Sequence, residues 1–298
     1  MDVEPGMCTT DKGGMAAMST KQNFGGAWTS EKLNILSDYL DFYVTALKNQ
    51  PFQLIYIDAF AGTGKICMGD ANEEIDGSAK LALQAKERFA EYIFIEKNKE
   101  YASELEQMVT DEFPDHKPRV KIVSDDCNTV LLDICKQVDW KKVRAVLFLD
   151  PYAADVKWET LQAIADTEAI DVWYLFPFNA ANRMMKRKGE IDPSWKRKLD
   201  SIFGDNSWET EFYKEDPQLN IFNEPSTICT VNTDSLKTYI ETRLETVFPG
   251  VSNKSLVLHN SKNSPLFLFC FAVSSKNVKA QGLAMKVANH ILNNKNRT

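Results

Sequence analysis

Acidic residues follow the apolar runs in the first half of the chain. Asp58 ends the run LIYID, Glu96 follows YIFI, and Asp125 and Asp126 come just after VKIV. Asp150 follows the run AVLFL. Short apolar runs of this kind predict buried parallel strands, and open α/β sheets bind their ligands beyond the carboxyl ends of such strands. The repeated acids therefore predict a nucleoside-binding site at this edge of a sheet.

Two glycines, Gly62 and Gly64, follow the first of these runs and predict a turn that a ligand can approach closely. A phosphate-binding P-loop would need glycine where Ala59 stands and serine or threonine where Ile66 stands, so that motif is excluded. A dinucleotide GxGxxG motif would need glycine at Cys67. An NAD enzyme is therefore an alternative that departs from the expected motif.

Strand and helix patterns alternate five times, which is typical of a doubly wound α/β sheet. Residues 65–77 lack a periodic pattern and predict a polar loop, and DVWYLFPF (171–178) predicts the fifth strand. Thr29 is a suitable N-cap for the first helix, which keeps its period up to Lys48. The other helices are predicted at 78–89, 99–113, 129–138, 158–167 and 280–292.

The C-terminal part has a different pattern. Residues 255–260 and 265–273 are apolar strands separated by four residues, too few for a crossover helix, so we expect them to be antiparallel. Residues 179–254 are predicted to be a helical, partly basic insertion between strands five and six. We expect residues 1–23 to be flexible and residues 24–298 to form one domain.

The composition is that of an ordinary globular protein, with 44% hydrophobic and 26% charged residues. The net charge of −7 argues against a nucleic-acid binder that uses its whole surface, but leaves room for a local basic patch. The six cysteines lack CxxC spacing and the three histidines do not cluster, so no metal site is expected. With no membrane-spanning run and no signal-peptide pattern, we expect a cytoplasmic location with no membrane partner.

DAFAGTG, FIEKN, SDDCN and FLDPY, in this order, resemble the successive motifs of class I S-adenosylmethionine-dependent methyltransferases. Together with FGGAWTSEKL and WYLFPF, they resemble the three-Cys-motif partner protein family over about residues 24–298. The resemblance implies a Rossmann-like α/β fold. Its sheet would have seven strands, mostly parallel with an antiparallel last strand, and helices on both faces.

The resemblance implies S-adenosylmethionine as cofactor. Asp58 would then stabilise the amino group of its methionine part, and Glu96 would accept hydrogen bonds from both ribose hydroxyls. Asp126 would accept one from the adenine amino group. The remaining cofactor-binding positions implied by the motifs are Phe60, Gly62, Gly64 and Cys127, with Trp28, Thr29 and Lys32 near the cofactor carboxylate. A solvated strand end or a helix N-cap is the simpler interpretation of any single acid.

Asp150, Pro151 and Tyr152 are the catalytic candidates. In amino-methyltransferases with a similar motif, the acid and a proline carbonyl hold the target N–H groups while the aromatic ring stacks on the substrate. Here a single proline and Ala153 depart from that pattern, so Phe178 or Trp28 is an alternative source of the ring. The predicted substrate-binding residues are Phe178 and the basic residues Arg183, Lys186, Arg187 and Lys188.

The basic stretch from 183 to 198 holds seven cations against two acids, a local charge of +5. This excess favours an anionic partner, and the leading hypothesis is methylation of an exocyclic amine of a nucleic acid base, in RNA or DNA. One alternative is a non-catalytic subunit that partners a three-Cys-motif radical-S-adenosylmethionine-like protein. Another is an amine methyltransferase for a protein or a small molecule.

Overall fold

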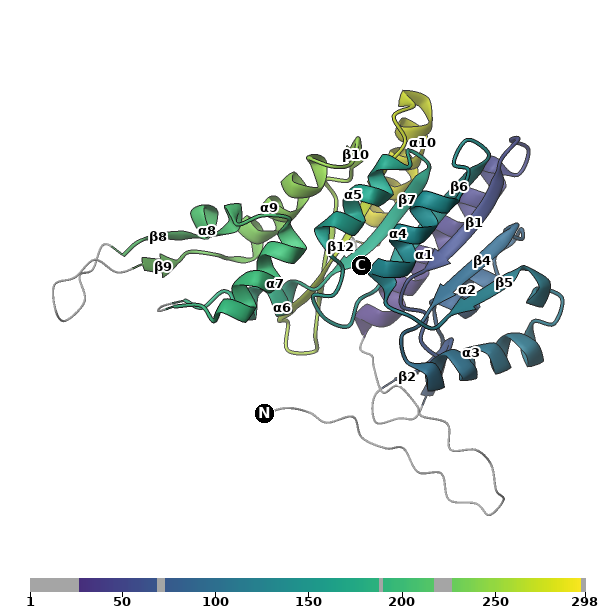
Figure 1. The fold of residues 1–298 in the computed structure, drawn as a ribbon, viewed down its shortest axis with the longest axis horizontal. Helices are drawn as coiled ribbons and strands as arrows, with labels where there is room; N and C mark the ends of the chain where they lie inside the picture. Colours follow the sequence, from purple (N-terminus) through teal and green to yellow (C-terminus); the bar gives the residue numbers. More distant parts are fainter. Residues whose placement is uncertain (1–26, 69–72, 188–189, 217–226, 296–298) are drawn as a thin grey trace, which may run out of the picture. The chain divides into compact units, whose positions relative to one another are not determined.

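The computed structural model describes residues 27–68, 73–187, 190–216 and 227–295. The predicted N-terminal segment, residues 1–23, lies outside them. The chain forms two compact units (Figure 1), the first built from residues up to 149 with the last residues from 290, and the second from residues 150–289. Helix α10 (Val278–Lys295) contributes residues to both.

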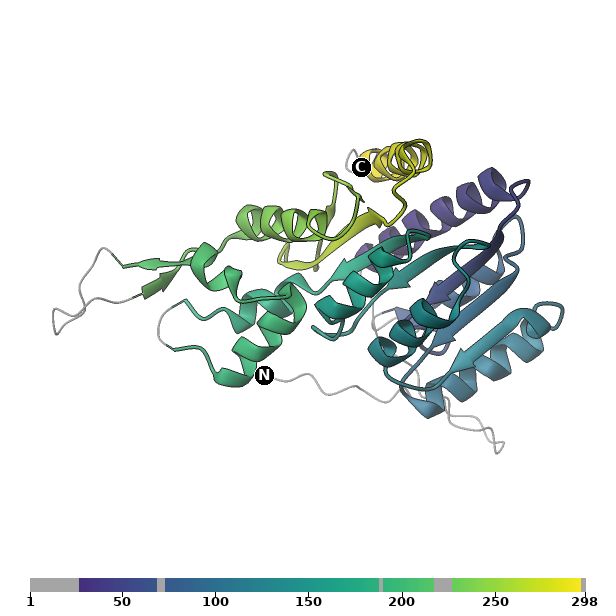
Figure 2. The same cartoon turned by 45° about the horizontal axis from the view of Figure 1, so that its top comes forward.

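The first unit contains four strands that pair in the order β6-β1-β4-β5, all parallel: β1 (Gln53–Asp58), β4 (Glu91–Ile95), β5 (Val120–Val123) and β6 (Val143–Leu149). Its helices are α1 (Ala27–Leu47), α2 (Ser78–Leu83), α3 (Lys99–Glu112) and α4 (Cys127–Gln137), with a 3-10 turn at Lys117–Arg119. Figure 2 shows α1 and α4 on opposite sides of these strands. Tyr56, Phe89, Tyr92 and Phe94 are fully buried in this unit, and their rings contact one another.

The predicted loop at 65–77 is wrong, because this segment contains an antiparallel hairpin of β2 (Lys65–Met68) and β3 (Glu73–Asp76). Lys65 and Asp76 are opposite partners in the hairpin, and Gly77 donates its N–H to the carbonyl of Gly64 at 2.8 Å. An ion pair joins Lys65 to Glu112 of α3 at 3.0 Å. The two strands, KICM and EEID, are too short and too polar to show an apolar period, so the sequence pattern does not indicate the hairpin.

Helix boundaries also differ from the predictions, among them the start of α1 and the end of α2. Helix α1 already includes Ala27, so Thr29 lies inside it and is not its N-cap. Helix α2 ends at Leu83 rather than continuing to Phe89, because side chains from elsewhere take the later N–H groups. Lys86 donates to the Asp41 carboxylate at 2.9 Å and Phe89 to the Tyr92 hydroxyl at 3.1 Å.

The second unit pairs its strands in the order β10-β12-β7, with β11 also on β12: β7 (Ile170–Phe176), β10 (Gly250–Val251), β11 (Leu256–His259) and β12 (Pro265–Val273). Every pairing within this unit is antiparallel, so the terminal hairpin is confirmed. The rings of Trp173, Phe269 and Phe271 pack together in its core, with centroids 4.7 and 4.9 Å from Trp173. The chain thus has the predicted α/β fold, a mostly parallel mixed sheet with an antiparallel hairpin near its end.

The segment between β7 and β11 is largely helical. Its elements are α6 (Phe178–Met184), α7 (Pro193–Phe203), α8 (Ser207–Phe212) and α9 (Thr233–Glu245), with α5 (Trp158–Asp166) preceding β7. It also holds an unpredicted hairpin of β8 (Tyr213–Glu215) and β9 (Thr227–Cys229). Strand β7 ends two residues earlier than predicted because Pro177 has no N–H, and Phe178 begins α6.

None of the described helices is long and apolar enough to cross a membrane. Four of the six cysteines, Cys127, Cys135, Cys229 and Cys270, are free thiols.

Candidate functional site

The glycine turn after β1 is held by the strands on both sides. Ala59 donates to the Phe148 carbonyl of β6, and Ala61 donates to the Ile95 carbonyl of β4, each at 3.0 Å. The strand pairing therefore continues past the end of β1 and fixes the start of the turn. Gly62 and Gly64 then adopt φ angles of +59° and +81°, which other residues rarely adopt.

Packing explains one of the two glycines. A Cβ atom at Gly64 would lie 2.5 Å from the Met108 methyl group and 3.1 Å from Leu105, both on α3. A Cβ at Gly77 would lie 3.0 Å from the Gly64 backbone. The close approach of α3 therefore accounts for Gly64, and the close approach of the Gly64 backbone accounts for Gly77. That Gly64 passes beneath a cofactor stays a prediction.

Glu96 connects the end of β4 to this turn. Its carboxylate accepts a hydrogen bond from the backbone N–H of Gly62 at 2.9 Å and from that of Asn98 at 2.8 Å. One oxygen serves each N–H. Because a carboxylate oxygen has two lone pairs, each oxygen keeps a second acceptor position. The half-buried side chain can thus fix the turn and still accept from a diol.

Asp58, at the end of β1, is fully buried. Its carboxylate accepts from the Tyr56 hydroxyl at 3.3 Å and from the backbone N–H of Phe60 at 3.2 Å. Phe60 is half-buried and lies next to the turn. A buried carboxylate needs such donors, since burying an unpaired charge is costly.

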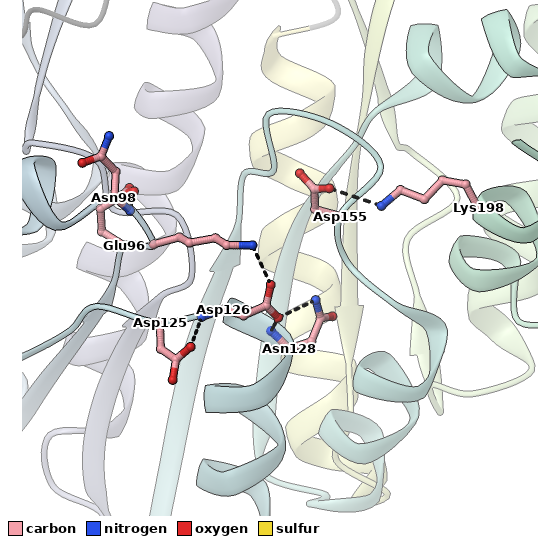
Figure 3. Close-up of polar contacts among 8 residues, drawn as sticks. Glu96, Asn98, Asp125, Asp126, Asn128, Asp155 and Lys198 are labelled. Carbon is pink, nitrogen blue, oxygen red and sulfur yellow. Dashed lines mark hydrogen bonds and ion pairs between the residues drawn. The ribbon is translucent and has the colours of Figure 1, made fainter. Parts of the chain in front are cut away.

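Asp126 is the N-cap of α4, as the simpler interpretation of this acid predicted. Its carboxylate accepts from the backbone and side-chain N–H groups of Asn128 at 3.0 and 3.2 Å, and lies 3.4 Å from the Lys97 ammonium (Figure 3). Asp125 accepts from the Asp126 N–H at 2.7 Å. Burial raises the pKa of Asp126. The hydrogen bonds from Asn128 and the charge of Lys97 together outweigh this effect, so the pKa lies below its ordinary value. Cys127, the first residue of the helix, is buried.

The first turn of α1 supplies an unusual polar group. Lys32 is 4% exposed, with its ammonium 5.0 Å from the centre of the half-buried Trp28 ring. Thr29 is also buried, and its hydroxyl has no hydrogen-bond partner among the described residues. Figures 1 and 2 both show the start of α1 and the end of β1 at the same edge of the first unit.

These residues fit a cofactor that has a ribose diol and an amino acid part. Glu96 retains acceptor capacity for the diol, and the Thr29 hydroxyl is buried without a partner. A buried ammonium, Lys32, lies one helical turn from Thr29. All the predicted cofactor-binding positions belong to the first unit.

The catalytic candidates begin the second unit, directly after β6 in the chain. Asp150 is half-buried and Pro151 is buried, whereas Tyr152 is 76% exposed. Tyr152 is therefore not a core aromatic. Of the two alternative rings, Phe178 is buried at the start of α6, and Trp28 is half-buried in α1. The ring of Tyr152 is the most accessible of the three.

The predicted basic residues have different environments. Arg183 and Lys186 are exposed, and Lys188 lies outside the described residues. Arg187 donates its guanidinium N–H to the Val231 carbonyl at 2.6 Å, so it binds backbone within its own unit. Farther along, Lys196 pairs with Glu209 at 2.8 Å. Some of the positive charges predicted from the sequence to bind a partner are therefore hydrogen-bonded or ion-paired within the second unit.

Two hollows occur elsewhere in the first unit. One, of about 430 Å³, lies on the outer face of α1 against Lys86, and the other, of about 350 Å³, lies between α3 and β5. No predicted cofactor-binding residue lines either hollow. We place the candidate site at the glycine turn because hydrogen-bonding groups converge there.

Sequence reasoning missed three residues of the site. Asn98 caps α3, Asn128 donates to Asp126, and Lys97 pairs with it. The N-cap pattern, an asparagine directly before a helical stretch, could have identified Asn98. Nothing in the local sequence indicates the other two partners.

No protein-family model and no curated protein matches the sequence. The resemblance to the three-Cys-motif partner protein family therefore stays a prediction. Among solved structures, a Legionella pneumophila protein assigned to family DUF519 is similar with a TM-score of 0.41 and 14% identity, over 74% of this chain and 92% of that one.

Two further neighbours carry informative names. The methyltransferase domain of a bacterial Hen1 has a TM-score of 0.38 and 13% identity, over 80% of this chain and 99% of that one. The N-terminal domain of EvdMO1 with SAH bound has a TM-score of 0.37 and 10% identity, over 81% of each chain. One of these two neighbours is thus named as a methyltransferase domain, and the other was solved with SAH bound. They do not indicate the acceptor.

Proposed function

We propose that the protein is an S-adenosylmethionine-dependent methyltransferase that modifies an exocyclic amine of a nucleic acid base. One observation carries the proposal: Glu96 holds the N–H of Gly62 and retains two acceptor positions beside the end of β1. A carboxylate so placed supports binding of a ribose diol at the carboxyl ends of parallel strands.

The other cofactor contacts follow from burial. The orphan Thr29 hydroxyl and the Lys32 ammonium would bind the carboxylate of the methionine part, because both are buried polar groups on the same face of α1. Asp58 would attract the amino group, directly or through water. Asp126 would accept from the adenine amino group while it also caps α4.

Bound cofactor would supply an electrophilic methyl group on a sulfonium. Asp150 and the Pro151 carbonyl would accept hydrogen bonds from the two N–H groups of the target amine and so aim its lone pair. Tyr152, which is exposed, would stack on the base. These contacts act by positioning.

The proposal of a nucleic acid acceptor depends on the second unit. Its exposed Arg183 and Lys186 support contact with an anionic partner, whereas the net charge of the whole chain is −7. Membership of the three-Cys-motif partner protein family, with a radical-S-adenosylmethionine-like partner, is part of this proposal.

The test is calorimetric titration with S-adenosylmethionine and with NAD. We expect only S-adenosylmethionine to bind. Glu96→Gln should weaken its binding by roughly 1.5–3 kcal/mol, because the amide loses the charge and one of the two acceptor oxygens. Glu100→Gln is the matched control, since Glu100 is an exposed acid at the start of α3. Binding of NAD alone, or equal affinity in Glu96→Gln and wild type, would contradict the cofactor assignment.

A second measurement follows methyl transfer to nucleic acid by mass analysis of the nucleosides. Asp150→Ala is expected to abolish transfer and leave cofactor affinity unchanged, because the acid contacts the acceptor. Cofactor binding without transfer in the wild type would instead favour the non-catalytic subunit.

A further inference from the structure

Trp195 is an exposed aromatic residue in a basic environment. It lies in the first turn of α7, and 39% of its surface is accessible. Isolated exposed apolar residues are common and need no explanation. Trp195 differs because the ammonium of Lys186 lies 5.8 Å from the centre of its ring.

The cations around Trp195 are of two kinds. Lys196 and Lys198 are each paired with an acid, and Arg187 binds backbone carbonyls. Lys186 and Arg197 are exposed, and no acid among the described residues forms an ion pair with either. Two charges in this part of the second unit are therefore available to an anionic ligand.

Helix α7 also connects this aromatic residue to the candidate catalytic loop. Trp195 and Lys198 are three residues apart, so they lie on the same face of the helix. Lys198 pairs with Asp155 at 3.3 Å (Figure 3). Asp155 lies three residues after Tyr152 in the chain, so the face of α7 that carries Trp195 also contacts the loop that carries the exposed tyrosine.

We propose that Trp195 and Lys186 form a subsite for an unpaired base and its phosphate, beside the base held at Tyr152, so that the acceptor is a single-stranded nucleic acid. This inference rests on the proposed function. A base stacks on an aromatic side chain only when it is released from its neighbours, as in a single strand. In a duplex the flanking bases remain stacked, so a protein reaches their edges and the phosphates but not the base faces on which a tryptophan would stack.

The experiment measures fluorescence anisotropy with full-length protein and 12-nucleotide labelled oligonucleotides of mixed sequence. The probes are single-stranded RNA, single-stranded DNA and the DNA duplex. We expect the wild type to prefer the single strands, and the comparison of RNA with DNA tells which one is the acceptor. Trp195→Ala is expected to weaken single-strand binding about 5- to 100-fold, and Trp195→Phe much less, because a ring remains.

Lys186→Gln is expected to lower the slope of log affinity against log salt by about 0.7, the value for one phosphate contact on a single strand. Leu283→Ala and Lys286→Gln on α10 are matched controls that remove an exposed apolar side chain and an exposed charge elsewhere in the second unit. Both controls should bind single strands as the wild type does.

Equal single-strand affinity in Trp195→Ala and wild type, with both proteins folded by circular dichroism, would overturn the proposal. Tighter binding of the duplex would also overturn it. If Trp195→Ala fails to fold, the other two variants test the proposal. A salt slope in Lys186→Gln equal to that of the wild type, together with unchanged single-strand affinity in Trp195→Phe, would then overturn it. If the wild type binds no oligonucleotide, the nucleic acid acceptor is wrong as well, whereas titration with S-adenosylmethionine separately tests the cofactor site.

Discussion

Each unit holds a glycine turn with one charged side chain, but the charges are opposite. In the first unit the Glu96 carboxylate accepts from the N–H of Gly62. In the second, the Arg243 guanidinium donates to the Phe203 carbonyl at 2.7 and 3.0 Å, directly before Gly204. The charged group is in both cases a structural element of the turn.

The two turns differ in what remains available. Arg243 also pairs with Asp205 at 2.8 Å and lies 5.0 Å from the centre of the Trp158 ring. Glu96 accepts two backbone N–H groups and keeps one acceptor position on each oxygen. A charge at a turn therefore suggests a ligand site only when hydrogen-bonding capacity is left over, as at Glu96.

The largest difference in stability is expected from alanine at the two glycines. In Gly204→Ala the new Cβ would overlap the Trp158 ring, which is rigid and covered by Arg243, and φ is +92°. We expect a loss of about 2–5 kcal/mol, from a left-handed conformation and overpacking together. Gly64→Ala, where the nearest atom ends the flexible Met108 side chain, is expected to lose only about 1–2 kcal/mol.

Urea denaturation measures both values. Gly282→Ala in α10 is the control, because no atom lies within 4 Å of the added Cβ, and it should be neutral or stabilise by up to about 1 kcal/mol. Equal losses at Gly64 and Gly204 would show that the backbone angle alone, and not the rigid ring, sets the cost.

A smaller and pH-dependent loss is expected for Asp126→Ala, which removes the N-cap of α4. At pH 7 it should destabilise by about 1 kcal/mol. Because the folded pKa of Asp126 lies below its ordinary 3.8, its contribution is present above that value and is lost as pH falls through the folded pKa. Denaturation at pH 7 and near pH 3 should therefore show the difference from wild type shrinking in acid.

Asp133→Ala, an exposed acid on the same helix, is the control and should stay within about 0.5 kcal/mol of wild type at both pH values. A loss from Asp126→Ala that is the same at both pH values would mean that the carboxylate charge does not stabilise α4.

The smallest effect is expected from the ion pair of Lys198 with Asp155, whose side chains are 43% and 48% exposed. A double-mutant cycle with Lys198→Met and Asp155→Asn should give a coupling of less than about 1 kcal/mol. The Tm of the wild-type protein should fall slightly as salt is added if this ion pair contributes to stability. A larger, salt-independent coupling would mean that the contact between α7 and the 150–157 loop is a packed interface rather than a surface pair.

Most of the fold could be predicted because it depends on local patterns. The apolar runs located β1, β4, β6, β7 and β12, since burial on both faces requires continuous apolar residues. They also located β5, although this edge strand has no buried residue. The four-residue gap between the last two runs determined that they are antiparallel. Element ends depend more on tertiary contacts: the Lys86 N–H, beyond the end of α2, is taken by Asp41, which lies 45 residues away in the sequence.

The sequence by itself determined which residues stand at the strand ends: Asp58, Glu96, Asp126 and Asp150 are placed there by the length of each apolar run. Only the tertiary structure decided what each charge contacts. Glu96 reaches Gly62 across 34 residues, and Arg187 reaches Val231 across 44. Such contacts form when strands and helices pack, and no local pattern encodes them. For the same reason, the structure alone distinguishes Lys186, beside an exposed tryptophan, from Lys196 and Lys198, which are paired with acids.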